Sequence, residues 1–442
     1  MSGANVRRAA ADLLFLTLEK RRTLDQAMAE SAPFEEIDGP DRGFARAIAS
    51  AALRELGRID LALAPLLSRP LQAVSPAIRA LLRVGAVQLW RMDVPQHAAV
   101  SETVEAAKHW PDARSGGAFL NAVLRRAAAS PPDLDATPVT AIWPDWLKTA
   151  FEDSLGAEGA AALATAQLTE PAIYLTAKTD PAAVAELTSG TLDVSGSIRA
   201  PGGQVEALPG YETGDWWVQD PGAALAARLL LSGSPSNASG SQQQAAGSHT
   251  ITLIDLCAAP GGKTLQLCAS GADVIAVDRS KPRLKRLEEN LERTGLTATV
   301  IAADAETWRP DALVDGLLLD APCSALGTLR RHPEGAFIKR AEDVARFPDV
   351  QYRLLKAAAE MVKPGGTLIY CVCTPLKSEG MDVVDRAVAE GLVQRVPVAA
   401  EEVPGFEACL TGTGDLLTLP GPQAEHDAFF MSRLSPVAGK SA

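Results

Sequence analysis

Two cysteines, each of which follows a short hydrophobic run, are the residues in this sequence most suited to take part in a chemical reaction. One is Cys323, in Asp320-Ala321-Pro322-Cys323-Ser324, and the other is Cys373, in Tyr370-Cys371-Val372-Cys373-Thr374-Pro375, with Lys377 and Glu379 close behind it. A lone buried cysteine is usually inert packing. Two thiols that each stand beside a proline at the end of a predicted strand instead indicate a reactive pair, because neighbouring parallel strands end at one edge of a sheet.

A glycine turn follows another hydrophobic run, at Leu253–Leu256. The run continues as Cys257-Ala258-Ala259-Pro260-Gly261-Gly262-Lys263, where two residues without a Cβ let a ligand lie against the main chain ahead of a helix. A phosphate-binding P-loop is unlikely here, because Cys257 stands where that motif needs glycine and Pro260 lacks an N–H. The G-x-G-x-x-G dinucleotide spacing is absent. What remains is an adenosine-containing cofactor such as S-adenosyl-L-methionine, with an ordinary strand-to-helix connection as the alternative.

Three aspartates also fall at predicted strand ends. Asp278 is suited to ribose hydroxyls, Asp304 to an adenine amine, and Asp320 precedes the first thiol. Each of the first two is equally compatible with a helix N-cap. Three acidic strand ends in series favour a cofactor pocket.

Composition bounds the class of protein. The chain has 442 residues, of which 47% are hydrophobic and 22% charged, enough for two or three globular domains. A formal net charge of −12 argues against a protein that coats nucleic acid indiscriminately. With no apolar run long enough for a membrane span and six thinly spread cysteines, we expect a cytoplasmic protein with reduced thiols. Cys371-x-Cys373 lacks zinc-site spacing, so no metal site is expected.

Local basic sites remain compatible with the acidic total. Positive residues gather at Arg279–Arg286, which includes Arg283, and at Arg330-Arg331-His332. Such runs are more often the solvated face of a helix than a binding patch. Their nearness to the other motifs makes them candidate phosphate contacts.

Periodicity and breakers divide the chain into four parts. Residues 1–132 predict an all-α domain, 138–231 a small α+β subdomain, 232–250 a flexible Ser/Gly/Gln insertion and 251–436 an α/β domain with a doubly wound, mostly parallel sheet. The Pro-rich stretch at 130–138 predicts a linker. In the last part we expect strands at 253–256, 273–277, 298–302, 314–319 and 366–371, helices at 264–270, 282–293 and 350–361, and an antiparallel edge pair at 416–419 and 429–434.

Two resemblances follow from these motifs. The stretches Ala98–Lys108 and Gly117–Arg126 resemble the last helices of a NusB-like RNA-binding domain, with a purely structural bundle as the alternative. Residues 140–434 resemble the Sun-type family of RNA cytosine-C5 methyltransferases, on the three motifs at Cys257–Lys263, Asp320–Ser324 and Arg330–Pro333. Together the resemblances cover nearly everything except the 232–250 insertion.

The resemblance implies an S-adenosyl-L-methionine-dependent enzyme whose mechanism needs two thiols. Because cytosine C5 is a poor nucleophile, a thiolate first adds to C6, and the resemblance gives that attack to Cys373. Asp320 would hold or protonate N3, and release would belong to Cys323, or to a base or water that it assists. DNA cytosine methyltransferases use a Pro-Cys pair, so the two cysteine roles are open to exchange. Cys371 fits a structural position in the strand.

The sequence departs from the family pattern in two places. The usual Thr-Cys-Ser is Val372-Cys373-Thr374, which keeps the thiol, and the usual Arg-Val-Asn is replaced around Leu175–Lys178, which puts the RNA contact expected there in doubt. We hypothesise a monomeric enzyme acting on small-subunit ribosomal RNA. The alternatives are a transfer-RNA cytosine-C5 methyltransferase and a non-catalytic RNA-binding assembly or antitermination factor.

Overall fold

The computed structural model describes residues 3–233, 251–421 and 424–437, which form two compact units. The first comprises residues 1–170 together with 329–341, and the second comprises 171–328 and 342–442. The predicted insertion at 232–250 lies almost wholly outside the described residues. No helix in the described ranges is long and apolar enough to span a membrane.

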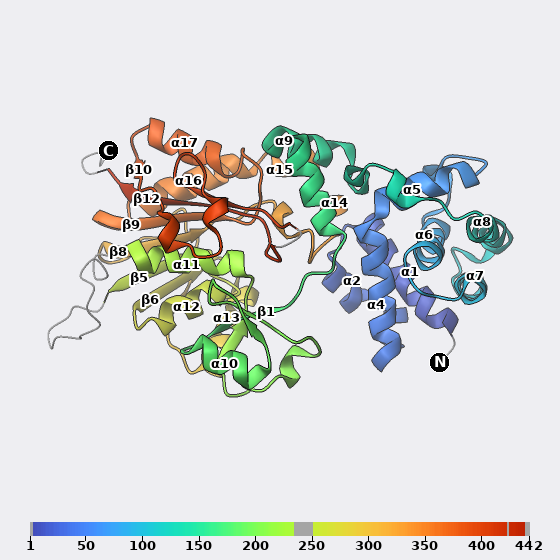
Figure 1. Ribbon diagram of the computed structural model, residues 1–442, viewed down its shortest axis with the longest axis horizontal. Helices are drawn as coiled ribbons and strands as arrows, with labels where there is room; N and C mark the ends of the chain where they lie inside the picture. The colour runs from blue at the N-terminus through green and yellow to red at the C-terminus, as the bar shows by residue number, and fades with distance from the viewer. Residues whose placement is uncertain (1–2, 234–250, 422–423, 438–442) are drawn as a thin grey trace. The chain divides into compact units, whose positions relative to one another are not determined.

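The first unit is helical, as the periodicity predicts (Figure 1). Alanine and leucine at three- and four-residue spacing give each helix an apolar stripe, and α1 packs against α4, α6 and α7. Its helices are α1 (Gly3–Lys20), α2 (Leu24–Glu30), α3 (Ala32–Glu35), α4 (Gly39–Arg54), α5 (Leu56–Leu63), α6 (Pro76–Trp90), α7 (Gln96–Lys108), α8 (Gly117–Ala129) and α9 (Asp145–Gln167). The short helix α14 (Gly335–Ile338) joins them from the second chain segment.

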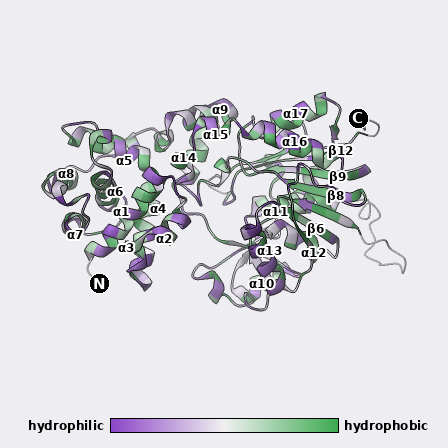
Figure 2. Cartoon of the chain, turned by 180° about the vertical axis from the view of Figure 1, so that it is seen from behind, coloured by the Kyte–Doolittle hydropathy of each residue, from purple (hydrophilic) through white to green (hydrophobic). Residues whose placement is uncertain are grey.

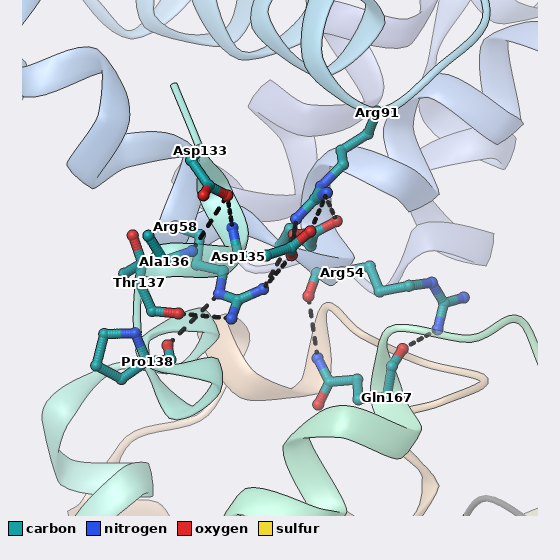
Figure 3. Close-up of polar contacts among 10 residues, drawn as sticks. Arg54, Arg58, Arg91, Asp133, Asp135, Ala136, Thr137, Pro138 and Gln167 are labelled. Atoms are coloured by element: carbon teal, nitrogen blue, oxygen red, sulfur yellow. Dashed lines mark hydrogen bonds and ion pairs between the residues drawn. The ribbon is translucent and has the colours of Figure 1, made fainter. Parts of the chain in front are cut away.

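The stretch predicted as a linker is bound to these helices (Figure 3). Arg58 donates to the carbonyl of Thr137 at 2.6 Å, and Arg91 donates to the carboxylate of Asp135 at 2.7 Å. Arg54 then donates to the carbonyl of Gln167 at the end of α9, at 2.6 Å. These contacts fix residues 130–138 and α9 to the helical unit, which therefore extends to Glu170.

The second unit begins with a small four-stranded antiparallel sheet. Its strand order is β2 (Thr191–Leu192), β3 (Ile198–Arg199), β1 (Tyr174–Ala177) and β4 (Trp216–Val218), and α10 (Pro181–Thr188) packs against it. Trp216, Leu175 and Ile198 form its buried core. This small sheet confirms the α+β character predicted for the segment before the insertion.

The larger sheet has the order β10-β12-β9-β8-β5-β6-β7, with β11 paired to β12. Its strands are β5 (Thr252–Leu256), β6 (Asp273–Asp278), β7 (Thr299–Ala302), β8 (Val314–Asp320), β9 (Val362–Val372), β10 (Val393–Arg395), β11 (Leu416–Thr418) and β12 (Phe429–Pro436). The strands β5 to β9 pair in parallel, and β12 pairs antiparallel with β9. A doubly wound, mostly parallel sheet is confirmed.

Helices cover both faces of this sheet (Figure 1). α11 (Pro221–Gly233), α12 (Gly262–Ala269) and α13 (Lys281–Thr294) pack on one face, and α16 (Phe347–Ala359) and α17 (Met381–Ala389) on the other. Neighbouring strand residues bury alternately on the two faces, as Leu318 and Leu319 do, so the central strands are mainly apolar (Figure 2). The remaining helix is α15 (Ala341–Val344). One detail of the prediction is wrong: β12 does not lie at the edge, because β10 pairs with its outer side.

Candidate active site

The glycine turn connects β5 to α12 as predicted. Gly261 adopts a φ of +112°, a conformation that glycine tolerates and other residues rarely adopt, and it is packed against Leu287 of α13. Within β5, the carboxyl of Asp255 is fully buried and accepts a 2.6 Å hydrogen bond from Thr264 Oγ1. Burial raises the pKa of Asp255 to about 7. The bond ties β5 to the first turn of α12, directly after the glycine turn.

Asp278 ends β6 with its carboxylate 3% exposed. It accepts the amide N–H of Ala259 at 3.2 Å and that of Ser280 at 2.8 Å, and the Arg283 guanidinium lies 3.5 Å away. Ser280 occupies the N-cap position of α13, so Asp278 is not that helix's N-cap. Arg283 also donates to the carbonyl of Ala259. The carboxylate thus braces the glycine turn from the neighbouring strand.

A cavity of about 470 Å³ opens at the C-terminal ends of the parallel strands. It is lined by residues predicted for both cofactor and catalysis, namely Cys257, Asp278, Arg283, Asp304, Asp320, Cys323 and Cys373. Asp304 is exposed and accepts the amide N–H of Glu306 at 2.9 Å. The volume lies in the range of small-molecule sites, and a lining that combines carboxylates with thiols suits a nucleoside-containing methyl donor.

A second cavity of about 470 Å³ shares Asp320 with the first. It is lined by the other part of the predicted turn, Ala258, Pro260, Gly261, Gly262 and Lys263, together with Trp217 and Arg293. The predicted cofactor residues therefore divide between two hollows that meet at one carboxylate. Sequence spacing places these residues in one turn and carries no signal for that division.

Lys263 is paired with Asp320. Its Nζ lies 2.8 Å from Oδ2 of Asp320 and 5.6 Å from the centre of the Phe429 ring. Burial, the largest single effect, would lower the pKa of Lys263, but the charge and hydrogen bond of Asp320, together with the neighbouring Cys371 and Cys373, raise it. The pair keeps an ammonium and a carboxylate fixed beside the thiols, and Asp320 is the Lys263 partner that the sequence left undefined.

The two predicted thiols meet. Cys323 and Cys373 have their Sγ atoms 3.2 Å apart, because Asp320 at the end of β8 pairs with Cys371 near the end of β9. The contact with Cys373, followed by burial, raises the pKa of Cys323 well above its usual range. Cys257 also lines the cavity, but burial and nearby carboxylates raise its pKa to about 12. Cys371 is fully buried in the core, in agreement with a structural position.

The predicted RNA contacts lie in the segment 329–341, which belongs to the helical unit. Arg330 is only 4% exposed, and its carbonyl accepts a 2.9 Å hydrogen bond from Arg54. His332 is exposed, with its Nδ1 3.7 Å from the buried Glu334. The basic run at Arg279–Arg286 follows the exposed face of α13, and Arg279 and Arg283 reach the first cavity.

Thr176 and Lys178 lie in the segment where the family usually has Arg-Val-Asn. Lys178 donates from Nζ to the carbonyl of Thr294 at 2.6 Å, at the C-terminus of α13, and Thr176 is 7% exposed. A cation at a helix C-terminus is favoured by the exposed carbonyls there. In this chain, therefore, the segment expected to contact RNA instead places a lysine at the C-terminus of α13.

Comparison with known proteins identifies the family. The sequence model described as "16S rRNA methyltransferase RsmB/F" matches residues 246–435, and that of the NusB family matches residues 4–129. The protein named "Ribosomal RNA small subunit methyltransferase B" from Vibrio vulnificus is 32% identical over 93% of this chain and 97% of its own length. The chain belongs to the RsmB/F methyltransferase family. The protein of the same name from Pseudomonas putida is also 32% identical, over 98% of this chain and 99% of its own length.

Solved structures share the RsmB/F fold. The crystal structure of PH0851 matches with a TM-score of 0.74 at 21% identity, and covers 98% of this chain and 99% of that one. The structure of NSun6 from Pyrococcus horikoshii, solved with SFG, matches with a TM-score of 0.55 at 18% identity, over 67% of this chain and 99% of that one. The chain is accordingly an S-adenosyl-L-methionine-dependent RNA methyltransferase with a NusB-like helical domain.

Proposed function

We propose that this protein transfers a methyl group to C5 of a cytosine in 16S ribosomal RNA through a covalent bond between Cys373 and C6. The observation that supports this most is the pair of sulfur atoms 3.2 Å apart in a cavity that also contains Asp320 and Asp278. S-adenosyl-L-methionine, when bound, supplies the methyl group as an electrophilic sulfonium. Residues Cys257 to Lys263, Asp278, Arg283, Asp304 and Asp320 would hold it.

The protein's own groups would act in sequence. The Cys373 sulfur forms a bond to C6 of the flipped base, which moves electron density to C5 so that C5 can take the methyl group. Asp320 in its acid form would donate a proton to N3 as negative charge develops on the ring, and the Lys263 ammonium 2.8 Å away would stabilise the carboxylate that this leaves. The C5 proton then leaves, the C6–S bond breaks and the ring double bond re-forms. Cys323, or a base or water that it assists, would serve this release.

The basic segment of the helical unit supplies candidate RNA contacts. Arg331 and His332 are the more accessible members of their cluster, while the buried Arg330 would contact RNA only if binding uncovers it. We further propose that the protein acts as a monomer in the cytoplasm. The names of its relatives favour small-subunit ribosomal RNA over transfer RNA.

Methyl transfer from a radiolabelled donor tests the proposal. Purified 16S RNA from a strain that lacks the corresponding gene should gain label at a cytosine, and bisulfite mapping should locate it. Label in transfer RNA instead would support the alternative substrate. If neither RNA gained label, alone or in the 30S particle, while the protein still bound RNA, a non-catalytic assembly role would be favoured.

A further inference from the structure

A buried hydrogen-bond network joins the two loops that carry the thiols. Oε2 of Glu379 accepts the amide N–H of Ser324, which follows Cys323, at 2.8 Å. Nε2 of Gln351 donates to the same oxygen at 3.1 Å and to the carbonyl of Pro322, which precedes Cys323, at 3.0 Å. Glu379, Gln351 and Ser324 are all fully buried. The residues on both sides of Cys323 are therefore held by one carboxylate and one amide.

The same network reaches the second thiol. Ser324 Oγ donates to Thr374 Oγ1 at 3.2 Å, and the amide of Gly327 donates to the carbonyl of Cys373 at 2.9 Å. Glu379 is fixed in turn from β9, because the Tyr370 hydroxyl donates to its main-chain carbonyl at 2.5 Å. The side chains that link the two thiol loops, Ser324, Thr374, Gln351 and Glu379, are buried, whereas the two thiols themselves are partly exposed.

A buried carboxylate is expensive unless its hydrogen bonds and its charge serve the surrounding structure. A reaction in which one thiol must act on an adduct formed by the other requires fixed spacing, since a misplacement of about 1 Å can reduce a rate by about 100-fold. We propose that Glu379 is a positioning residue that holds Cys323 beside Cys373 for the release step. This inference rests on the proposed roles of the two thiols.

Glu379 also acts on Cys323 by its charge. The ionisable groups that face Cys323 are Tyr370 in β9, Cys373 directly after β9, and Glu379 in the segment before α17. After the contact with Cys373 and burial, the negative charge of Glu379 contributes to the raised pKa of Cys323. A neutral side chain of the same shape would keep the hydrogen bond from Ser324 and lower the pKa of Cys323.

Two variants separate position from charge. Glu379→Ala removes the acceptor, and we expect about 10- to 100-fold lower kcat, an RNA KM within about twofold, and more RNA–protein adduct that survives denaturation. Glu379→Gln should restore most of kcat and move the pH dependence of kcat to lower pH. Asp382→Asn removes an exposed carboxylate three residues away and is the matched control.

The outcomes are decisive in either direction. Raised adduct with Glu379→Ala and a shifted pH profile with Glu379→Gln support the proposal. Kinetics equal to those of Asp382→Asn in both variants would overturn it, as would loss of folded protein in both variants, which would make the role purely structural. Cys373→Ser and Cys323→Ser measured in parallel test the proposed function separately, because full transfer by Cys373→Ser contradicts the thiol roles whatever Glu379 does.

Discussion

The sulfur atoms of Cys323 and Cys373 lie 3.2 Å apart although the residues are 50 positions apart in sequence. The parallel pairing of β8 with β9 creates this contact, since Leu319 pairs with Tyr370 and Asp320 with Cys371. The contact, followed by burial, raises the pKa of Cys323, and the proposed reaction gives the two thiols inequivalent roles.

This inequivalence predicts opposite phenotypes for two conservative substitutions. Cys373→Ser should lower methyl transfer by about 1,000-fold or more, because a hydroxyl at that position is a far weaker nucleophile. Cys323→Ser should still form the bond to C6 but release it slowly, so a protein–RNA adduct should accumulate. Denaturing gels of each variant with labelled RNA measure both effects. Adduct with Cys373→Ser and none with Cys323→Ser would exchange the roles.

The ion pair between Lys263 and Asp320 predicts a second catalytic defect. Lys263→Met keeps the length of the side chain but leaves the partly buried carboxylate of Asp320 without its ammonium partner. We expect kcat to fall by about 100-fold, since a preorganised charge beside the reacting base is removed. Lys356→Met, on the exposed side of α16, should leave kcat unchanged. Single-turnover methyl transfer measures the effect, and equal rates for the two variants would contradict it.

Much of this site follows from local sequence signals. Strand ends, the glycine turn and the two thiol motifs are local patterns, and parallel pairing then brings Asp278, Asp320, Cys323 and Cys373 to one edge. The sequence indicates Glu379 only by its nearness to Cys373, and it carries no signal for the role of Gln351. Their hydrogen bonds depend on how α16 and the segment before α17 pack against the sheet, which no local pattern encodes.

Arg330 and β12 illustrate the same limit in the rest of the fold. A basic triplet predicts exposure, but Arg330 is buried because residues 329–341 pack with the helical unit, where Leu24 donates its amide N–H to Glu334 at 3.2 Å. The apolar residues of β12 predict that it is a strand. Its place between β9 and β10 is not, because the pairing is set by partners far apart in the chain.

The buried carboxyl of Asp255 predicts a pH-dependent stability. Its folded pKa of about 7 lies above the unfolded value of about 3.9, so the folded state binds the proton more tightly and stability falls as pH rises from about 4 to 7. The difference amounts to about 4 kcal/mol. Asp255→Asn should remove this dependence while retaining an acceptor for Thr264. Urea unfolding of both proteins at pH 5 and pH 8 tests this prediction. If Asp255→Asn showed the same change in unfolding free energy between the two pH values as the unsubstituted protein, the raised pKa of Asp255 would be contradicted.

The glycine turn predicts a local steric effect. A Cβ at Gly261 would lie 2.9 Å from Cγ of Leu287, and the φ of +112° adds backbone strain, so Gly261→Ala should lower stability by about 1–3 kcal/mol and weaken cofactor binding. Gly271 has a φ of +86° with nothing near its Cβ position, so Gly271→Ala isolates the backbone contribution. Calorimetric titration with S-adenosyl-L-methionine should show an affinity loss only for Gly261→Ala. Equal affinities in both variants would remove this turn from the cofactor site.

Buried Arg330 and its more accessible neighbour Arg331 predict opposite responses. Nε and Nη1 of Arg330 are buried without a hydrogen-bond partner in the described part of the chain, and burial, together with charges that include Arg330, lowers the pKa of the nearby Arg54. Arg330→Met should therefore raise the free energy of unfolding by about 1 kcal/mol, because it removes unsatisfied buried donors and a like charge. Arg331→Met should change stability by less than about 0.5 kcal/mol but weaken RNA binding and reduce the salt dependence by about one phosphate contact.

Urea unfolding and RNA binding at several salt concentrations distinguish the effects of the two substitutions. A large destabilisation by Arg330→Met would mean that its guanidinium is a structural anchor, and loss of RNA affinity in that variant despite a gain in stability would mark Arg330 as a phosphate ligand uncovered on binding.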